Sequence, residues 1–294
     1  MRGSKPERVI EESIERDGVI LPGERVLVAC SGGSDSVALA ALLRAVAKPL
    51  KLSLVLGHVN HGLRRSAWQD EAVALRASAA LGIPLHVVAL EDQNTDEASL
   101  RDARYGALEA LAVRCGAGVV ATGHTAEDQT ETLLLALFRG TGLAGLAGMR
   151  PRRELGSGVG LVRPLLRFER SLLRRYVFDA ALPYAIDPSN RDLNLRRNAV
   201  RAALAALRPL FPGLDAAVAR TADVVSGEAS KSPSSGLRRQ VREALGEQDA
   251  LRDVDFAHVE AAVRALQTGG SGRFYMKAGV ELRVEKGSFE VTRG

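Results

Sequence analysis

Residues 24–36 read ERVLVACSGGSDS, and the fold class can be predicted from them. Its first seven residues are a short, mostly apolar run of the kind that forms a buried strand. Two glycines then allow a tight turn, and a helical pattern runs from Ser34 to about Val46. A glycine turn between a strand and a helix leaves backbone N–H groups at a helix N-terminus, where they bind anions. The stretch therefore predicts a phosphate-binding loop in an α/β protein.

Strand and helix patterns alternate after this loop. Apolar runs that predict strands lie at 52–58, 84–90 and 118–122, and helical patterns lie at 68–81, 97–114 and 126–138. The alternation predicts a parallel sheet with helices on both faces, which binds ligands at the carboxyl ends of its strands. The elements expected further on are helices at 169–181, 194–207, 237–245 and 256–266, a linker at 226–236, and a small antiparallel meander at 273–277, 281–285 and 289–292.

Composition restricts the class of protein. The 294 residues are 46% hydrophobic and 26% charged, as in soluble globular proteins. Residues 151–208 hold 12 Arg against 5 Asp or Glu, so 12 − 5 = +7, which suggests a polyanionic partner, although composition alone slightly favours the alternative of a solvated, arginine-rich surface. Cys30 and Cys115 have no metal-ligand spacing, so a disulfide framework or structural metal cluster is not expected. Without a signal-peptide pattern or a membrane-length apolar run, the protein is expected to be cytoplasmic, with no membrane partner.

The loop offers six candidate nucleotide-binding residues: Ser31, Gly32, Gly33, Ser34, Asp35 and Ser36. Its backbone and hydroxyl groups supply donors for phosphate oxygens. A carboxylate at Asp35 would repel bare phosphate, so it indicates a divalent cation that shares the site. The alternative is an ordinary helix cap after a glycine turn. No Lys-Ser or Lys-Thr pair follows the glycines, so the loop is not a Walker A motif.

Two further polar segments follow predicted strands. His58, His61 and Arg64 form a polar rim after the second strand, although such residues can also simply cap a loop. His124 and Asp128 follow the fourth strand and lie four residues apart, hence on one face of a helix. An acidic residue in a first helical turn can serve helix initiation alone. A carboxylate and an imidazole together at a strand end favour metal binding or acid–base chemistry.

The hexapeptide SGGSDS at 31–36 resembles the PP-loop of N-type ATP pyrophosphatases. The resemblance implies a parallel-sheet, adenine nucleotide alpha hydrolase-like fold with a helical extension and a small α+β C-terminal domain. It implies that the loop holds the β,γ-phosphates of ATP, that ATP is cleaved to AMP and pyrophosphate, and that a substrate oxygen is activated as an adenylate. Mg²⁺ would accompany the ATP.

Several loosely spaced segments resemble the tRNA(Ile)-lysidine synthase family within that class. They are HVNHGLR at 58–64, EASLRDARY at 97–105, GHTAEDQTET at 123–132, the glycine-rich 140–149, RPLL at 163–166, DPSN at 187–190, and Asn198 with Arg201. Two residues depart from the family pattern: Asn60 and Glu127 replace aspartates. The resemblance covers about residues 20–208 and implies a catalytic domain at 1–208, followed by a linker and a tRNA-binding domain at 209–294.

The resemblance implies ATP-dependent ligation of L-lysine to C2 of the wobble cytidine of tRNA(Ile) with a CAU anticodon, and a homodimer. Asp35 and Asp128 would hold Mg²⁺, Arg104 would neutralise phosphate charge, and His124 would act beside them. His58 and His61 would border the nucleotide. The residues implied for substrate or tRNA contact are Arg64, Arg101, Asp187, Asn190, Asn198 and Arg201. The alternatives are a tRNA thiolation enzyme of the same fold and a non-catalytic nucleotide- or RNA-binding module.

Overall fold

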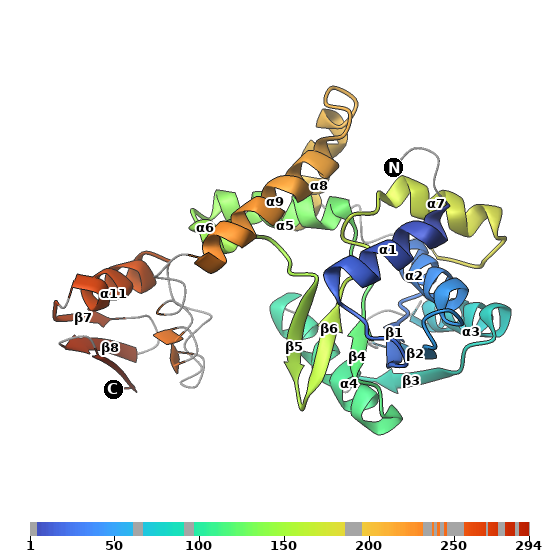
Figure 1. Cartoon of the computed structure of the whole chain (residues 1–294), viewed down its shortest axis with the longest axis horizontal. Helices are drawn as coiled ribbons and strands as arrows, with labels where there is room; N and C mark the ends of the chain where they lie inside the picture. Colours follow the sequence, from blue (N-terminus) through green and yellow to red (C-terminus); the bar gives the residue numbers. More distant parts are fainter. Residues whose placement is uncertain are drawn as a thin grey trace. The chain divides into compact units, whose positions relative to one another are not determined.

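The computed structural model describes residues 5–60, 67–90, 97–185 and 196–231 and, further on, 237, 240–241, 244–245, 256–268, 270–275, 280–285 and 288–293. The chain divides into two compact units, Met1–Glu131 with Met149–Ala219 and Thr132–Gly148 with Arg220–Gly294 (Figure 1). The first unit contains the sheet that the sequence predicts. No helix among the described residues is long and apolar enough to cross a membrane.

The sheet of the first unit has the order β3-β2-β1-β4-β6-β5. Its strands are β1 (Arg25–Ala29), β2 (Ser53–Asn60), β3 (Leu85–Ala89), β4 (Val119–Ala121), β5 (Arg152–Gly156) and β6 (Val159–Val162). All neighbouring pairs are parallel except β5 with β6, which is antiparallel. The predicted α/β class with a mostly parallel sheet is confirmed.

Helices cover both faces of this sheet (Figure 1). The helices that pack against it are α1 (Pro6–Asp17), α2 (Ser34–Val46), α3 (Ala67–Leu81), α4 (Glu97–Cys115) and α7 (Arg170–Asp179), and α8 (Arg196–Leu207) follows in the same unit. Alternate residues of β1 point to opposite faces. Val26 and Val28 pack into a core with α1, α2, α3 and α7, whereas Leu27 packs into a second core with α4. Burial on both faces explains why the strand is an uninterrupted apolar run.

The predicted phosphate loop, after β1, lies at the point where the order of strands reverses. From β1 the chain proceeds outward through β2 and β3 and then returns to β4 on the other side of β1. Segments that follow β1 and β4 therefore meet, which is where sheets of this type bind ligands. Glycine permits the contact: a Cβ at Gly123, just after β4, would lie 2.9 Å from the carbonyl oxygen of Asp35.

Some elements were missed by the sequence patterns. The hairpin of β5 and β6 was not expected, because Arg152–Gly156 is a charged edge strand without an apolar run. Helix α1 was also missed. The linker expected at 226–236 is wrong over 226–231, because α9 (Leu214–Lys231) continues through those residues. The small residues and hydroxyls of this segment are compatible with a helix, although their composition is typical of a linker.

The second unit contains a small sheet of its own. Strands β7 (Gly272–Tyr275), β8 (Val280–Glu285) and β9 (Ser288–Arg293) pair antiparallel in the order β7-β8-β9, as the predicted meander requires. Helix α11 (Phe256–Thr268) shares a buried apolar cluster with this sheet through Val259, Val263 and Leu282. The α+β character expected for the C-terminal part is confirmed.

The conformation of Gly32 gives a test of the loop. Its φ is +86°, and a Cβ there would lie 2.9 Å from the carbonyl oxygen of Asp70. We expect Gly32→Ala to lower the free energy of unfolding by at least about 1–2 kcal/mol, the cost of a side chain at positive φ. Gly106 lies within α4 with no atom within 4 Å of its Cβ position, so Gly106→Ala should instead raise stability by about 0.5–1 kcal/mol. Urea denaturation measures both, and equal effects would contradict the strained geometry of the loop.

Candidate active site

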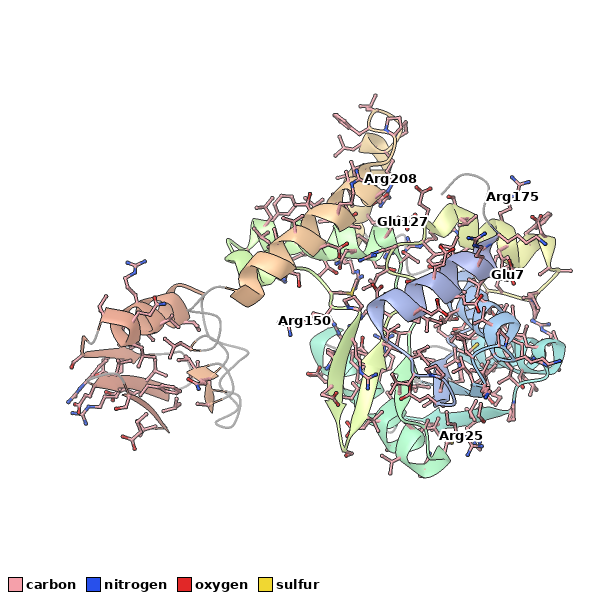
Figure 2. The ribbon with its side chains drawn as sticks, in the orientation of Figure 1. Glu7, Arg25, Glu127, Arg150, Arg175 and Arg208 are labelled. Atoms are coloured by element: carbon pink, nitrogen blue, oxygen red, sulfur yellow. The ribbon has the colours of Figure 1, made fainter. Side chains whose placement is uncertain are left out.

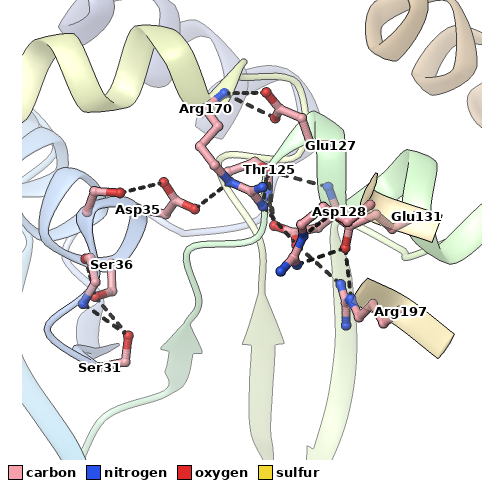
Figure 3. Close-up of polar contacts among 12 residues, drawn as sticks. Ser31, Asp35, Ser36, Thr125, Glu127, Asp128, Glu131, Arg170 and Arg197 are labelled. Atoms are coloured by element: carbon pink, nitrogen blue, oxygen red, sulfur yellow. Dashed lines mark hydrogen bonds and ion pairs between the residues drawn. The ribbon is translucent and has the colours of Figure 1, made fainter. Parts of the chain in front are cut away.

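The loop between β1 and α2 is closed by its own serines. Gly33 is the N-cap of α2, with φ −72° and ψ 156°. The Ser36 hydroxyl donates to the Gly33 carbonyl at 2.9 Å, and the Ser31 hydroxyl donates to Ser36 Oγ at 3.2 Å (Figure 3). Ser31 Oγ also accepts the Gly33 N–H at 3.4 Å. These bonds fix the turn in advance and leave its helix N-terminus at the carboxyl end of β1, which suits an anion.

His58 supports the loop through the main chain. Its side chain is buried at the end of β2, and Nδ1 lies 2.8 Å from the carbonyl oxygen of Cys30, directly before the loop. The imidazole thus fixes the backbone on which the loop begins, and its expected contact with the nucleotide stays a prediction. His61 and Arg64 lie outside the described residues.

Asp128 has two roles at the start of α5 (Ala126–Phe138). Its Oδ2 accepts the backbone N–H of Thr125 at 2.9 Å and the Thr125 hydroxyl at 3.0 Å, while Thr125 Oγ1 accepts the Asp128 N–H at 3.4 Å. This reciprocal pair is a capping box. Oδ1 remains for other contacts, so helix initiation uses only half of the carboxylate.

Arg170, at the first position of α7, links the segments that follow β1 and β4. Its Nε donates to Asp35 Oδ2 at 2.9 Å, and its terminal nitrogen lies 3.1 Å from Asp128 Oδ1 (Figure 3). The backbone N–H of Arg170 is held by both oxygens of Glu127, at 2.8 and 3.0 Å. One guanidinium therefore lies between the two carboxylates that the sequence singled out. The sequence reasoning missed Arg170, although it lies seven residues after the first residue of RPLL.

The two carboxylates differ in their protonation. Burial would raise the pKa of Asp128, but the positive charges of Arg170 and Arg197 outweigh it and lower this pKa to about 2. Burial raises the pKa of Asp35 despite the attraction of Arg170, and repulsion from Asp128 adds to the effect. Asp128 is thus a permanent anion, and Asp35 is the carboxylate whose charge is easier to remove.

A second group of ion pairs continues the site along α5. Glu131 is fully buried and accepts from Arg197 Nε at 2.9 Å and from Arg201 Nε at 2.8 Å. Arg197 also contacts Asp128 Oδ1 at 3.2 Å, and Arg201 lies 3.4 Å from the Asn198 side-chain oxygen. Asn198 and Arg201, expected from sequence, are therefore brought to the site by Glu131. Glu131 and Arg197 were missed, although Glu131 lies within the quoted segment 123–132.

His124 is a neutral imidazole. Burial lowers its pKa to about 3, and the positive charges of Arg163 and Arg197 act in the same direction, against the attraction of Asp128. Its Nδ1 lies 2.9 Å from Thr122 Oγ1, which is 3.4 Å from the Val162 carbonyl oxygen. When the hydroxyl donates to that carbonyl, Nδ1 carries the proton and Nε2 is left as an acceptor.

The arginines predicted on α4 lie beside Tyr105. The Arg101 guanidinium is 5.6 Å from the centroid of the Tyr105 ring. Burial would raise the pKa of Tyr105, but the positive charges of Arg101, Arg163 and Arg104 outweigh burial and lower it. Arg101 also contributes to the positive charge around His124. Asp187 and Asn190 lie outside the described residues.

The carboxylate pair fits a Mg²⁺ ion that arrives with a triphosphate. Asp35 and Asp128 bond to one guanidinium, so both direct an oxygen toward a shared volume that already holds a positive charge. Mg²⁺ takes one or two carboxylates and completes its shell with phosphate oxygens and water. Among the described residues no group of three or more His, Cys, Asp or Glu could hold a metal, so this pair is not a closed metal site made by protein alone.

Comparison with known proteins agrees with this geometry. A family model described as the PP-loop domain matches residues 5–207. The mostly parallel sheet, the glycine loop after β1 and this match define the class as PP-loop proteins. The tRNA(Ile)-lysidine synthase of Salinispora arenicola is 41% identical over 290 residues, which cover 96% of this chain and 84% of the relative. That of Gloeobacter violaceus is 36% identical over 261 residues, covering 87% and 80%. The chain therefore belongs to the tRNA(Ile)-lysidine synthase family.

Some relatives are longer than this chain. The tRNA(Ile)-lysidine synthase of Ruegeria pomeroyi is 44% identical over 199 residues, and the match covers 66% of this chain but only 46% of the relative. Among solved structures, the U34-tRNA thiolase NcsA from Methanococcus maripaludis with its [4Fe-4S] cluster has a TM-score of 0.65 at 20% identity. It covers 75% of this chain and 77% of its own. This likeness supports the fold.

The bridging role of Arg170 can be tested by stability. We expect Arg170→Gln to lower the free energy of unfolding by about 3 kcal/mol, the low end for a broken buried ion pair because these side chains keep some exposure. Mg²⁺ should restore part of the loss, because a divalent cation screens the same two carboxylates. Arg175→Gln, in the same helix but 82% exposed, is the control and should change stability by less than about 0.5 kcal/mol. If Mg²⁺ stabilised all three proteins equally, the shared volume between Asp35 and Asp128 would not be its site.

The low pKa of His124 predicts a pH-dependent stability. As pH falls from 6.5 toward 3, an unfolded histidine binds a proton that folded His124 does not, so the folded protein loses stability. In His124→Gln this loss disappears, so the variant should lose about 2 kcal/mol less than the parent between about pH 7 and about pH 4.5. Urea denaturation at both pH values measures the difference. His86→Gln, which changes an exposed histidine of β3, is the matched control. If the free energy of unfolding of His124→Gln changed with pH as much as that of the parent, the burial of a neutral imidazole would be contradicted.

Proposed function

We propose that this protein ligates L-lysine to C2 of the wobble cytidine of tRNA(Ile) with a CAU anticodon, at the expense of ATP. The C2 oxygen would first be adenylated, with release of pyrophosphate. The lysine ε-amine would then displace AMP, so that a carbon–nitrogen bond forms. Membership of the tRNA(Ile)-lysidine synthase family supports the reaction.

The observation that carries the proposal is the convergence of Asp35 and Asp128 on one guanidinium at the point where the order of strands reverses. The two residues come from separate motifs, and a helix cap alone would explain neither the direction of Asp128 Oδ1 nor the ion pair of Asp35. A non-catalytic nucleotide-binding module would not need two carboxylates beside its phosphate loop. Their arrangement supports an enzyme that handles Mg²⁺ and a triphosphate.

Each residue of the site then has a part in the reaction. The loop 31–36 would bind the β,γ-phosphates through the N-terminus of α2, and pyrophosphate would leave from there. Asp35 and Asp128 would hold Mg²⁺, which supplies positive charge to the phosphates. Arg104 would neutralise further charge that develops in the transition state. His124, neutral at physiological pH, would help to position the activated base by accepting a hydrogen bond at Nε2.

The rest of the chain would hold the RNA. The arginine-rich residues 151–208 and a C-terminal domain at 209–294 are proposed to contact tRNA, chiefly at its phosphates. A homodimer is proposed as well, and light scattering would test it. Arg64, Asp187 and Asn190 keep their proposed roles at the substrate.

A thiolation enzyme is the second candidate, and the cysteines disfavour it. The chain has two cysteines, Cys30 and Cys115, whereas an iron–sulfur cluster of the common type takes four thiolates. Burial raises the pKa of Cys30, so this thiol is held in its less reactive protonated form. Cys115 lies at the end of α4, away from the carboxyl ends of the strands.

The direct test incubates the purified protein with ATP, Mg²⁺, radiolabelled lysine and a CAU-anticodon tRNA(Ile) transcript. We expect acid-stable label in the RNA, and no label when the wobble cytidine is replaced. Pyrophosphate release that depends on tRNA, without incorporation of lysine, would leave PP-loop chemistry in place and remove lysine as the nucleophile.

The carboxylates give a more specific expectation. Asp35→Asn keeps the size of the side chain but removes its charge, so lysine incorporation should fall by about 100-fold or more, as when a group that stabilises transition-state charge is lost. Asp179→Asn, in the exposed pair with Arg175, should leave the rate unchanged. Full activity in a folded Asp35→Asn protein would remove Asp35 from the proposed mechanism.

A further inference from the structure

A cluster of arginines surrounds Tyr105 at the edge of the site. The Arg101 guanidinium lies 5.6 Å from the centroid of the Tyr105 ring, and that of Arg153 lies 5.1 Å from it. Arg163, which directly follows β6, interacts with the Tyr105 side chain and is only 3% exposed. Arg101 and Arg153 are exposed. Three elements, α4, β5 and the segment after β6, thus bring three guanidiniums to one aromatic ring, two of them open to solvent.

The charge of this cluster is not compensated by the protein. In the part of the chain that the structure describes, none of Arg101, Arg153 and Arg163 forms an ion pair with a carboxylate. Arg163 donates to the carbonyl oxygen of Arg150 at 2.7 Å (Arg150 is labelled in Figure 2), but its Nε is buried with no hydrogen-bond partner. A buried guanidinium with an open donor is unfavourable unless an anion pairs with it, because burial removes the water that would otherwise accept from that donor.

The neighbouring arginines show the contrast. Arg170, Arg197 and Arg201 each bond to at least one carboxylate of the group Asp35, Asp128 and Glu131. In that part of the site, carboxylates balance the charges of the arginines. The Tyr105 cluster is cationic. Burial lowers the pKa of Arg163, and repulsion from the positive charge of Arg153 lowers it further. Its missing partner is therefore an anion.

The place of the cluster in the sheet identifies the anion. The strand order β1-β4-β6 puts the phosphate loop after β1, His124 after β4 and Arg163 after β6, all at the carboxyl edge. The cluster thus lies on the side of His124 that faces away from the loop. A triphosphate bound at the loop occupies the β1 side, so the anion on the β6 side belongs to the other substrate. An RNA presents phosphates, which arginine binds with paired donors.

We propose that Arg101, Arg153 and Arg163 form a binding site for one backbone phosphate of the RNA substrate, next to the nucleotide that reacts at His124. The proposal rests on the proposed function, because that function makes an RNA the second substrate. Tyr105 supports the site: its ring carries the two exposed guanidiniums on its surface. The site extends the expected role of Arg101 to two arginines that no sequence motif singled out for RNA contact.

The test compares RNA and ATP binding in the full-length protein. Arg101→Gln/Arg153→Gln changes only exposed side chains, so the variant should fold as the parent does. We expect its affinity for the CAU-anticodon tRNA(Ile) transcript to fall roughly tenfold, and the slope of log affinity against log salt to decrease by roughly 0.7–0.9, the loss of one phosphate contact. Its ATP affinity, measured by equilibrium dialysis without RNA, should be unchanged.

Controls separate the outcomes. Arg76→Gln/Arg114→Gln removes two exposed charges, one from α3 and one from α4, outside the arginine-rich residues 151–208, and should leave the RNA affinity within about twofold and the salt slope unchanged. Equal RNA affinity in the Arg101→Gln/Arg153→Gln variant and the parent would overturn the phosphate site. A parallel loss of ATP affinity would also overturn it, because the cluster would then bind the triphosphate. Lysine incorporation by the parent protein is measured in parallel. If the parent binds the transcript but transfers no lysine, the proposed reaction is contradicted. The comparison of RNA affinities still decides whether the phosphate site exists.

Discussion

The guanidinium of Arg170 is the contact on which the site depends. Two carboxylates from separate helices, Asp35 and Asp128, point toward each other and would repel without a positive charge between them. Arg170 supplies that charge and is itself held in place by Glu127, which binds its backbone N–H. The starts of α2, α5 and α7 are thereby joined at one point.

Helix caps provide much of this geometry. Asp128 closes the first turn of α5 with Oδ2 and faces the arginines with Oδ1, so the residue is fixed by the helix that it begins. Glu127 acts similarly on α7. Groups positioned by backbone bonds need little reorganisation when a ligand arrives, which favours stabilisation of developing charge. For Asp128 and Glu127, the bonds that begin a helix are therefore also the bonds that orient the carboxylate.

The site has two electrostatic halves. Around α5, carboxylates and arginines are paired, and the shared volume between Asp35 and Asp128 suits a divalent cation. Around Tyr105, arginines meet without carboxylates. The proposed reaction, between a metal-bound triphosphate and a polyanionic RNA, would need both environments side by side, because one would accept a cation and the other would accept phosphate. His124 lies between them, and burial together with the arginines keeps it neutral.

Local patterns in the sequence were enough to predict the parallel strands β1 to β4, the helices that follow them and the phosphate loop, because apolar runs, helical periodicity and glycine turns depend on neighbouring residues. The sequence also indicated Asp35, His124 and Asp128, which directly follow strands. It did not reveal α1, the hairpin of β5 and β6, whose edge strand is charged, or the contacts of Arg170 and Arg163. Which arginines meet carboxylates, and which do not, depends on how distant segments pack together. The ion pair of Arg170 with Asp35 joins residues 135 positions apart, and no local pattern records such a contact.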